Sequence, residues 1–567
     1  METGEQAVPG KNCSLFPVPC SLKTERTDYL ATSNKKQTFL GGAAVLAVAT
    51  ALVKIIGAIY KIPLNRLLGP RGFGYFNTAY EIYSILLMIS TTGLPVAMSR
   101  MISEAKTLGQ TRQIRQIYRT SAIVFLLIGA VGTGGMMALC LPLAHAFGQV
   151  NSWFAILCLS PSVLFICLIS TDRGYFQGQS NMMPTSISQV MEAVCKLVVG
   201  LVAAYVLKKL TGSMVYAAGG AILGVTSSTL LSAVYLKFKH RQSETELQSE
   251  QCLDPTVYSR RSTVGKLLTI AIPITIGAAG LQLITAVDTS VYMHRLLGPG
   301  LAVPEKLKAD TADYVKGIYN FCQTVFNMPC AFITPLTISA IPAITEQLTL
   351  RRRRAANTVA ESAIRVMSLI SMPCSVGLIV LARPIMQLLG GYSGEDLARA
   401  ATLMQILGAC VFFNSLVLVL NAVMQAHGFV YIPVINMVVG GIARLIVTFI
   451  LAGNPKINIT GAAISTLSCY ALISVLNIFS LRRVLSRPPR IFSNLYKPAI
   501  ASVIMGGGAW LLVRLTRNMR VLLQLGVSMV GAVVIYVILV LALRIITADD
   551  CKLLPKGDKI AKILRIH

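Results

Sequence analysis

Long apolar segments are the feature that most constrains this chain of 567 residues. Fourteen such blocks follow one another, each of about 20 residues, which is the length at which an α-helix spans the bilayer core. Only 13% of the residues are charged, about half of the usual share in a soluble protein. Transmembrane strands would show alternating segments of about ten residues, and the sequence has none. It therefore predicts an all-α polytopic membrane protein with spans near 39–60, 75–95, 120–140, 153–171, 185–207, 214–236, 265–293, 315–342, 363–382, 401–421, 430–452, 458–480, 496–514 and 521–544.

The basic residues are distributed unevenly about these spans. The net charge of +28 would suit a nucleic-acid partner, but an N-terminus in the cytoplasm places about 32 of the Lys and Arg residues inside and about 15 outside. This is the positive-inside bias of helical membrane proteins. We therefore expect both termini in the cytoplasm, the lipid bilayer as a partner, and no nucleic acid.

An internal repeat divides the spans into two related halves. The motif Arg-Leu-Leu-Gly-Pro at 66–70 returns 229 residues later at 295–299, in each case just after a long apolar segment. Repeats of this kind are typical of transporters built from two lobes around a central site, and an even number of spans per repeat gives both halves the same orientation. Three further matches keep the same order: 92–104 with 334–346, Gln177 with Gln425, and Lys196 with Arg444, each cation 19 residues after its glutamine.

The repeat and the loops predict the domain organisation. Residues 1–36 are polar and lack the apolar core of a signal peptide, which favours a disordered cytoplasmic tail. The longest loop is polar and charged and separates span six from span seven. We expect an N-terminal six-helix lobe at 37–236, a cytoplasmic linker at 237–264, a C-terminal six-helix lobe at 265–484, and two extra helices with a basic tail at 485–567.

Ionisable side chains inside the spans mark candidate site residues, because such groups are costly in a bilayer and usually face a polar interior. Lys54 lies 15 residues into the first span, about 22 Å along a helix. It either snorkels or pairs with a carboxylate such as Glu81, or it faces an anionic substrate in a cavity. Asp288 in span seven suits three roles: pairing with a lysine, binding a coupling cation, or capping a broken helix.

Other polar residues in the spans suggest local or lobe-to-lobe contacts. Glu192 and Lys196 are four apart on one helix face, which favours a local ion pair. Arg444 has no nearby acid in sequence and must either find a partner on another helix or face water. Asn320, Gln323, Thr324 and Asn327 form a polar stripe on span eight.

No cofactor is expected, since the sequence has neither a Walker A motif nor the Cys and His spacing of a zinc site. A coupling cation, the membrane potential or the gradient of the substrate would supply the energy.

Several stretches resemble the stage V sporulation protein B group of the multidrug/oligosaccharidyl-lipid/polysaccharide exporter superfamily, which is similar to the lipid II flippases. The matching stretches are 54–57, 61–64, 67–69, 72–75, 79–83, 93–97, 173–178, 342–346 and 461–466, with Pro184, Glu192 and Asp288. Together they cover most of spans one to twelve.

This resemblance implies two six-helix lobes in a V with a central cavity, alternating access, and a place in a bacterial cytoplasmic membrane. It implies a lipid-linked oligosaccharide substrate, whose pyrophosphate a cationic cavity would stabilise. The chain departs from the lipid II flippases where they carry an arginine cluster, because it offers lysines instead, and lysine lacks the bidentate fork of arginine. The candidate cavity residues are Lys54, Lys61, Arg66, Glu81, Asp288, Asn320, Gln323 and Arg444.

The leading interpretation is a flippase for an undecaprenyl-pyrophosphate-linked precursor of the cell wall or of a polysaccharide. A cation-coupled multidrug exporter of the same superfamily is the first alternative, and it would need an acidic cavity, against which Lys54, Lys61 and Arg66 argue. A membrane-embedded glycosyltransferase or acyltransferase would need catalytic His or carboxylate groups near a membrane face, and none are grouped there. A scaffold in the sporulation or cell-wall machinery would leave the charges in the spans dispensable.

Overall fold

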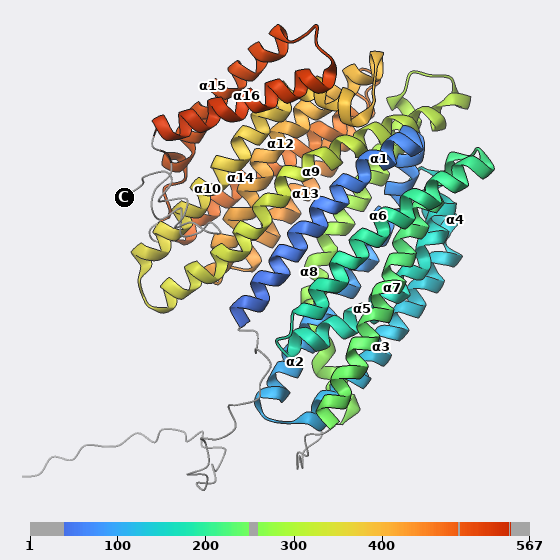
Figure 1. Ribbon diagram of the computed structural model, residues 1–567, viewed down its shortest axis with the longest axis vertical. Coiled ribbons are helices and arrows are strands. Elements are labelled where there is room, and N and C mark those ends of the chain that lie inside the picture. The colour runs from blue at the N-terminus through green and yellow to red at the C-terminus, as the bar shows by residue number, and fades with distance from the viewer. Residues whose placement is uncertain (1–38, 249–258, 486–487, 544, 546–567) are drawn as a thin grey trace, which may run out of the picture.

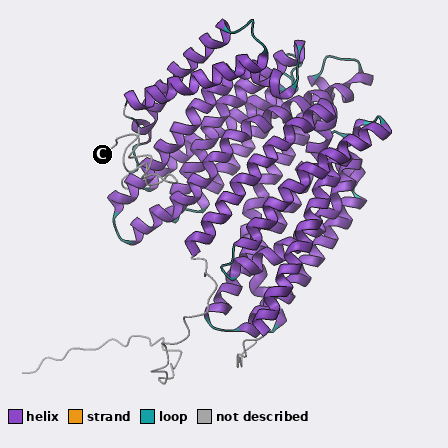
Figure 2. Ribbon diagram, in the orientation of Figure 1, coloured by secondary structure: helices purple, strands orange, loops and turns teal. Residues whose placement is uncertain are grey.

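The computed structural model describes residues 39–248, 259–485, 488–543 and 545. Within these ranges the chain consists of helices and their connections, without strands (Figure 2). The tail predicted at 1–36, the middle of the predicted linker and most of the basic C-terminal tail lie outside the described residues. Helix occupies both ends of that linker, which the sequence had assigned to a loop.

The N-terminal lobe consists of α1 (Phe39–Met88), η1 (Ile89–Gly93), α2 (Leu94–Thr107), α3 (Thr111–Ala138), α4 (Cys140–Ala146), η2 (Val150–Ser152), α5 (Trp153–Gly178), α6 (Met183–Thr211) and α7 (Met214–Gln248). The C-terminal lobe consists of α8 (Arg260–Arg295), η3 (Leu296–Gly300), α9 (Glu305–Thr349), α10 (Arg353–Val380), α11 (Ala382–Ile385), η4 (Met386–Gly390), α12 (Gly394–Ala426), α13 (Tyr431–Ala452) and α14 (Thr460–Val484). The last helices, α15 (Ile491–Leu515) and α16 (Val521–Ala542), flank this lobe beside α10 (Figure 1).

All fourteen predicted spans fall on helices. By length and apolar character alone, eleven helical stretches of the described residues are able to cross a membrane. The first of these, Val48–Thr107, contains the second half of the first predicted span and all of the second, while α8 and α9 are not among the eleven. Both of these helices carry polar residues in mid-span. Counting them and the second crossing of the first stretch, the fold has about fourteen transmembrane helices.

The repeated motif interrupts the helix in both halves, with a different backbone conformation in each. Gly69 interrupts α1 with φ of 64°, a left-handed conformation that glycine adopts without steric cost. Pro70 follows, and its fixed φ suits the first turn of the returning helix. Gly298 likewise departs from helical geometry within η3 and is followed by Pro299. We call the end of the bundle at these turns the far end, and the end where α1 begins the near end.

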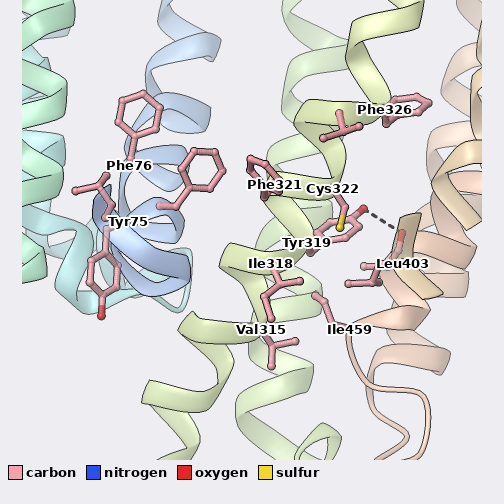
Figure 3. Packing of buried hydrophobic residues seen from close by; sticks show 14 of the residues in the cluster. Tyr75, Phe76, Val315, Ile318, Tyr319, Phe321, Cys322, Phe326, Leu403 and Ile459 are labelled. Carbon is pink, nitrogen blue, oxygen red and sulfur yellow. Dashed lines mark hydrogen bonds between the residues drawn. The ribbon is translucent and has the colours of Figure 1, made fainter. Parts of the chain in front are cut away.

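The largest part of the hydrophobic core joins the two lobes toward the far end. One large buried cluster contains Tyr60 and Phe73 of α1 together with Tyr319 and Phe321 of α9, so it belongs to both lobes. In Figure 3 aromatic side chains of α1 and α9 point toward each other. Toward the near end there are two separate clusters. One lies within α9, α10, α12, α14 and α15. The other lies within α2, α3, α5 and α7 of the N-terminal lobe and includes the start of α8, which packs against that lobe. The result is a V that closes at the far end.

The seam between α1 and α9 is held by a close backbone approach and by polar contacts. A Cβ added at Gly317 of α9 would lie 1.7 Å from the Pro70 carbonyl oxygen, so only glycine fits there. Beside this contact, Arg71 of α1 forms an ion pair of 3.6 Å with Asp310 of α9. Asn65 Nδ2 donates to the Gly390 carbonyl over 3.3 Å. The far end is therefore sealed in this conformation.

Candidate functional site

A cavity of about 650 Å³ lies between the lobes, on the near side of the seam. Its walls come from α1 and α6 of the N-terminal lobe and from α9 and α12 of the C-terminal lobe. The volume is within the usual range for small-molecule sites, about 300–1,000 Å³. Because both lobes contribute, any rearrangement of one lobe against the other changes the shape of this cavity.

Three lysines from the N-terminal lobe line the cavity. Lys54 reaches across to the other lobe, where its Nζ donates to Thr334 Oγ1 over 2.9 Å. Lys61 Nζ donates to Asn77 Oδ1 over 3.4 Å, between the two arms of α1. Lys196 of α6 lies 6.0 Å from the centre of the Tyr80 ring, which is the range of a cation–π contact.

The opposite wall is neutral. α9 and α12 supply Thr324, Asn327, Thr334 and Asn414, together with Cys330 and apolar side chains. None of the lining residues is Asp or Glu, and none of the three lysines forms an ion pair among the described residues. Uncompensated ammonium groups in a low-dielectric site attract anions strongly. The arrangement therefore favours an anionic ligand with an apolar part and disfavours a cationic one.

The predicted site residues occupy several different places. Lys54 and Lys61 line the cavity. Arg66 lies at the far end, where it donates to the Leu388 carbonyl. Two others lie on the seam helices beyond the cavity lining: Glu81 has a buried Oε2 without a hydrogen-bond partner, and Asn320 has a similarly unpartnered Nδ2. The remaining polar-stripe candidate, Gln323, is partly exposed on α9 and is not among the lining residues.

Asp288 and Arg444 pair with each other inside the C-terminal lobe. The carboxylate of Asp288 on α8 is fully buried and lies 2.7 Å from the Arg444 guanidinium on α13. Thr448 Oγ1 donates to the same carboxylate over 2.6 Å. Of the two alternatives for Arg444, the structure has the partner on another helix, and neither residue of the pair lines the cavity.

The sequence interpretation of Lys196 was wrong. Glu192 does not pair with it but with Arg173 of α5, at 3.2 Å, because the rotation of α6 turns Glu192 toward α5. Lys196 is thereby left for the cavity. The internal repeat contained a sequence signal for the importance of Lys196, since Lys196 matches Arg444 at the same spacing after a glutamine. The lining residues Tyr60, Tyr80 and Asn414 were also missed.

Comparison with known proteins shows which families this chain is similar to. The family model described as polysaccharide biosynthesis protein matches residues 39–348, and the MatE model matches residues 317–450. Stage V sporulation protein B of Bacillus subtilis (strain 168) is 25% identical over 92% of this chain and 98% of its own length. Lipid II flippase MurJ of the same organism is 23% identical over 72% of this chain and 76% of its own length.

Solved structures show the same fold. Lipid II flippase MurJ in an inward closed conformation superposes with a TM-score of 0.63 at 14% identity, covering 88% of this chain and 98% of that one. An inward-facing multidrug resistance MATE family transporter superposes with a TM-score of 0.57 at 13% identity, covering 79% and 94%. At these identities the likeness concerns the fold alone.

Proposed function

The chain belongs to the polysaccharide biosynthesis protein family, and we propose that it is a flippase for an undecaprenyl-pyrophosphate-linked precursor of the cell wall or of a polysaccharide. The relatives with a named activity are flippases and transporters rather than enzymes. The observation that carries the proposal is the cavity between the lobes, with three lysines and no carboxylate in its lining. The pyrophosphate would contact the lysines, which act as point charges for phosphate.

The proposed direction of transport rests on the charge distribution. The near end carries the basic clusters Arg112, Arg115 and Arg119; Arg260 and Arg261; and Arg351 to Arg354. By the positive-inside rule the near end faces the cytoplasm. The far end is sealed in this conformation, so the cavity would receive substrate from the inner leaflet and release it after the seam opens. A coupling cation or the membrane potential would drive the cycle.

The leading alternative, export of cationic drugs, lacks support in the cavity. A cationic ligand gains from carboxylates, and neither acid expected in the cavity lines it: Asp288 pairs with Arg444, and Glu81 is not a lining residue.

Translocation of fluorescent lipid II in proteoliposomes tests the proposal. We expect flipping by the wild-type protein and none by Lys54→Ala at equal insertion and yield. Lys209→Ala is the matched control, because Lys209 is exposed at the end of α6 and lies outside the cavity lining. If lipid II is not flipped, the same assay with another undecaprenyl-pyrophosphate-linked glycan shows whether the protein carries a different glycan or no lipid-linked glycan at all. Full activity of Lys54→Ala on every such substrate would refute the role of the cavity cation.

A further inference from the structure

A buried polar chain crosses the seam between the lobes beside the cavity. Lys316 of α9 is fully buried, and its Nζ donates to Thr78 Oγ1 of α1 over 2.6 Å. The Thr78 hydroxyl donates to Gln149 Oε1, and Gln149 Nε2 donates to Asp313 Oδ1 of α9 over 2.8 Å. An ammonium group removed from water requires a nearby negative charge.

Glu81 is placed to supply that charge. Lys61 is bonded to Asn77 and Lys316 to Thr78. Glu81 follows these two residues by four and three positions, so all three share one face of α1. Glu81 therefore lies one turn from the residues that hold both lysines, Asn77 for Lys61 and Thr78 for Lys316. Its Oε2 is buried and has no hydrogen-bond partner, so the carboxylate is not committed to either lysine.

The two lysines move differently when the far end opens. Lys61 and Glu81 belong to the two arms of α1 and stay within one lobe. Lys316 belongs to α9 of the other lobe, which meets α1 at Gly317 and Asp310. Separating these contacts removes Lys316 from Thr78 and leaves Lys61, bonded to Asn77 on the same face of α1, within the lobe of Glu81.

We propose that Glu81 is a partner-switching carboxylate, facing Lys316 while the far end is closed and Lys61 once α9 withdraws, and that it thereby lowers the affinity of the cavity for an anion as the far end opens. In the closed state Lys316 offsets Glu81, and Lys61 is available to the ligand. In the open state Glu81 competes with the ligand for Lys61. A transporter needs such a difference in affinity between its two states. Glu81 and Lys316 act through Lys61 and are positioning residues. The inference rests on the proposed function, in that it assumes an anionic substrate.

The test measures binding of farnesyl pyrophosphate to the purified full-length protein by calorimetry. We expect Lys316→Met to weaken binding about tenfold, within the usual range for coupled sites, because Glu81 then turns to Lys61 even without opening. Glu81→Gln should bind as tightly as the wild type or more tightly. The double variant should return to within about twofold of Glu81→Gln. Lys306→Met, an exposed lysine in the first turn of α9, is the control and should bind like the wild type.

Removing one member of a buried charged pair destabilises a fold and removing both restores it, so the affinities are compared only among variants whose melting temperatures match that of the wild type. If Lys316→Met does not yield folded protein, Thr78→Val releases Lys316 from α1 without deleting the charge, and it should weaken binding in the same direction, again reversed by Glu81→Gln. This inference alone is overturned if the wild type binds and Lys316→Met binds equally tightly. It is also overturned if Glu81→Gln does not restore the affinity lost in Lys316→Met. Absence of pyrophosphate binding by the wild type would overturn the proposed function and this inference together.

Discussion

The contact between Gly317 and Pro70 makes the closed far end unusually sensitive to one methyl group. In Gly317→Ala the new Cβ would lie 1.7 Å from the Pro70 carbonyl oxygen, whereas real Cβ contacts are essentially never under 3.0 Å. The obstacle is backbone, so a rotamer change cannot relieve it. The seam must widen by at least about 1.3 Å to reach that limit. Overpacking of this kind costs about 1–3 kcal/mol.

The cost applies only to the closed arrangement, because Gly317 and Pro70 belong to different lobes. An energy of about 1–3 kcal/mol corresponds to a population shift of about 5- to 150-fold. We therefore expect Gly317→Ala to favour conformations with an open far end while each lobe keeps its own core. Substrate binding from the near end should weaken, and water should reach the seam.

Crosslinking between the lobes measures this shift. Cysteines replace Arg71 and Asp310, an exposed pair across the seam, in a background lacking the 13 native cysteines. A short bifunctional thiol reagent should crosslink them efficiently when Gly317 is present and poorly in Gly317→Ala. Gly134→Ala is the matched control, since a Cβ there meets nothing within 4 Å. Equal crosslinking in both alanine variants, at equal melting temperature, would refute the steric reasoning.

Three further predictions concern the charges. Lys196→Ala should strongly reduce translocation while Lys209→Ala on the same helix leaves it intact, and equal activity of the two would remove Lys196 from the site. Asp288→Asn should impair transport by destabilising the C-terminal lobe, since breaking a buried ion pair costs about 3–5 kcal/mol; the melting temperature should fall, and replacing Asp288 and Arg444 together with leucine should recover much of the loss. Ile59 lines the cavity at the position that the repeat offset of 229 residues assigns to Asp288. Ile59→Asp should therefore neutralise Lys196 and weaken farnesyl pyrophosphate binding more than Ile59→Asn does, and an equal effect of both substitutions would argue against charge.

The fold was predictable because its signals are local. An apolar block of about 20 residues specifies a spanning helix by itself, and the Gly-Pro pair specifies the turn at Gly69 through backbone conformation. Lys54 and Lys61 were also recognisable, because a cation within a span has few stable places other than a polar interior. Each of these inferences depends on neighbours along the chain.

The partners of the charged residues were not predictable, because they depend on how each helix is rotated in the bundle. Glu192 lies one turn from Lys196 and yet pairs with Arg173 on another helix. Asp288 and Arg444 are far apart in sequence and meet within the C-terminal lobe. Arg66 was grouped with the cavity lysines, but the turn at Gly69 places it beside the seam, where it contacts Leu388.

The repeat explains why one lobe alone supplies the positive charge of the cavity. In the C-terminal lobe the cation that follows the repeated glutamine is Arg444, and Asp288 neutralises it within the lobe. In the N-terminal lobe the matching cation is Lys196, and the matching position in the first helix is Ile59, an apolar residue. Without an acid at that position Lys196 is available to the cavity, beside Lys54 and Lys61. Loss or gain of a single carboxylate after duplication thus separates a structural half from a binding half.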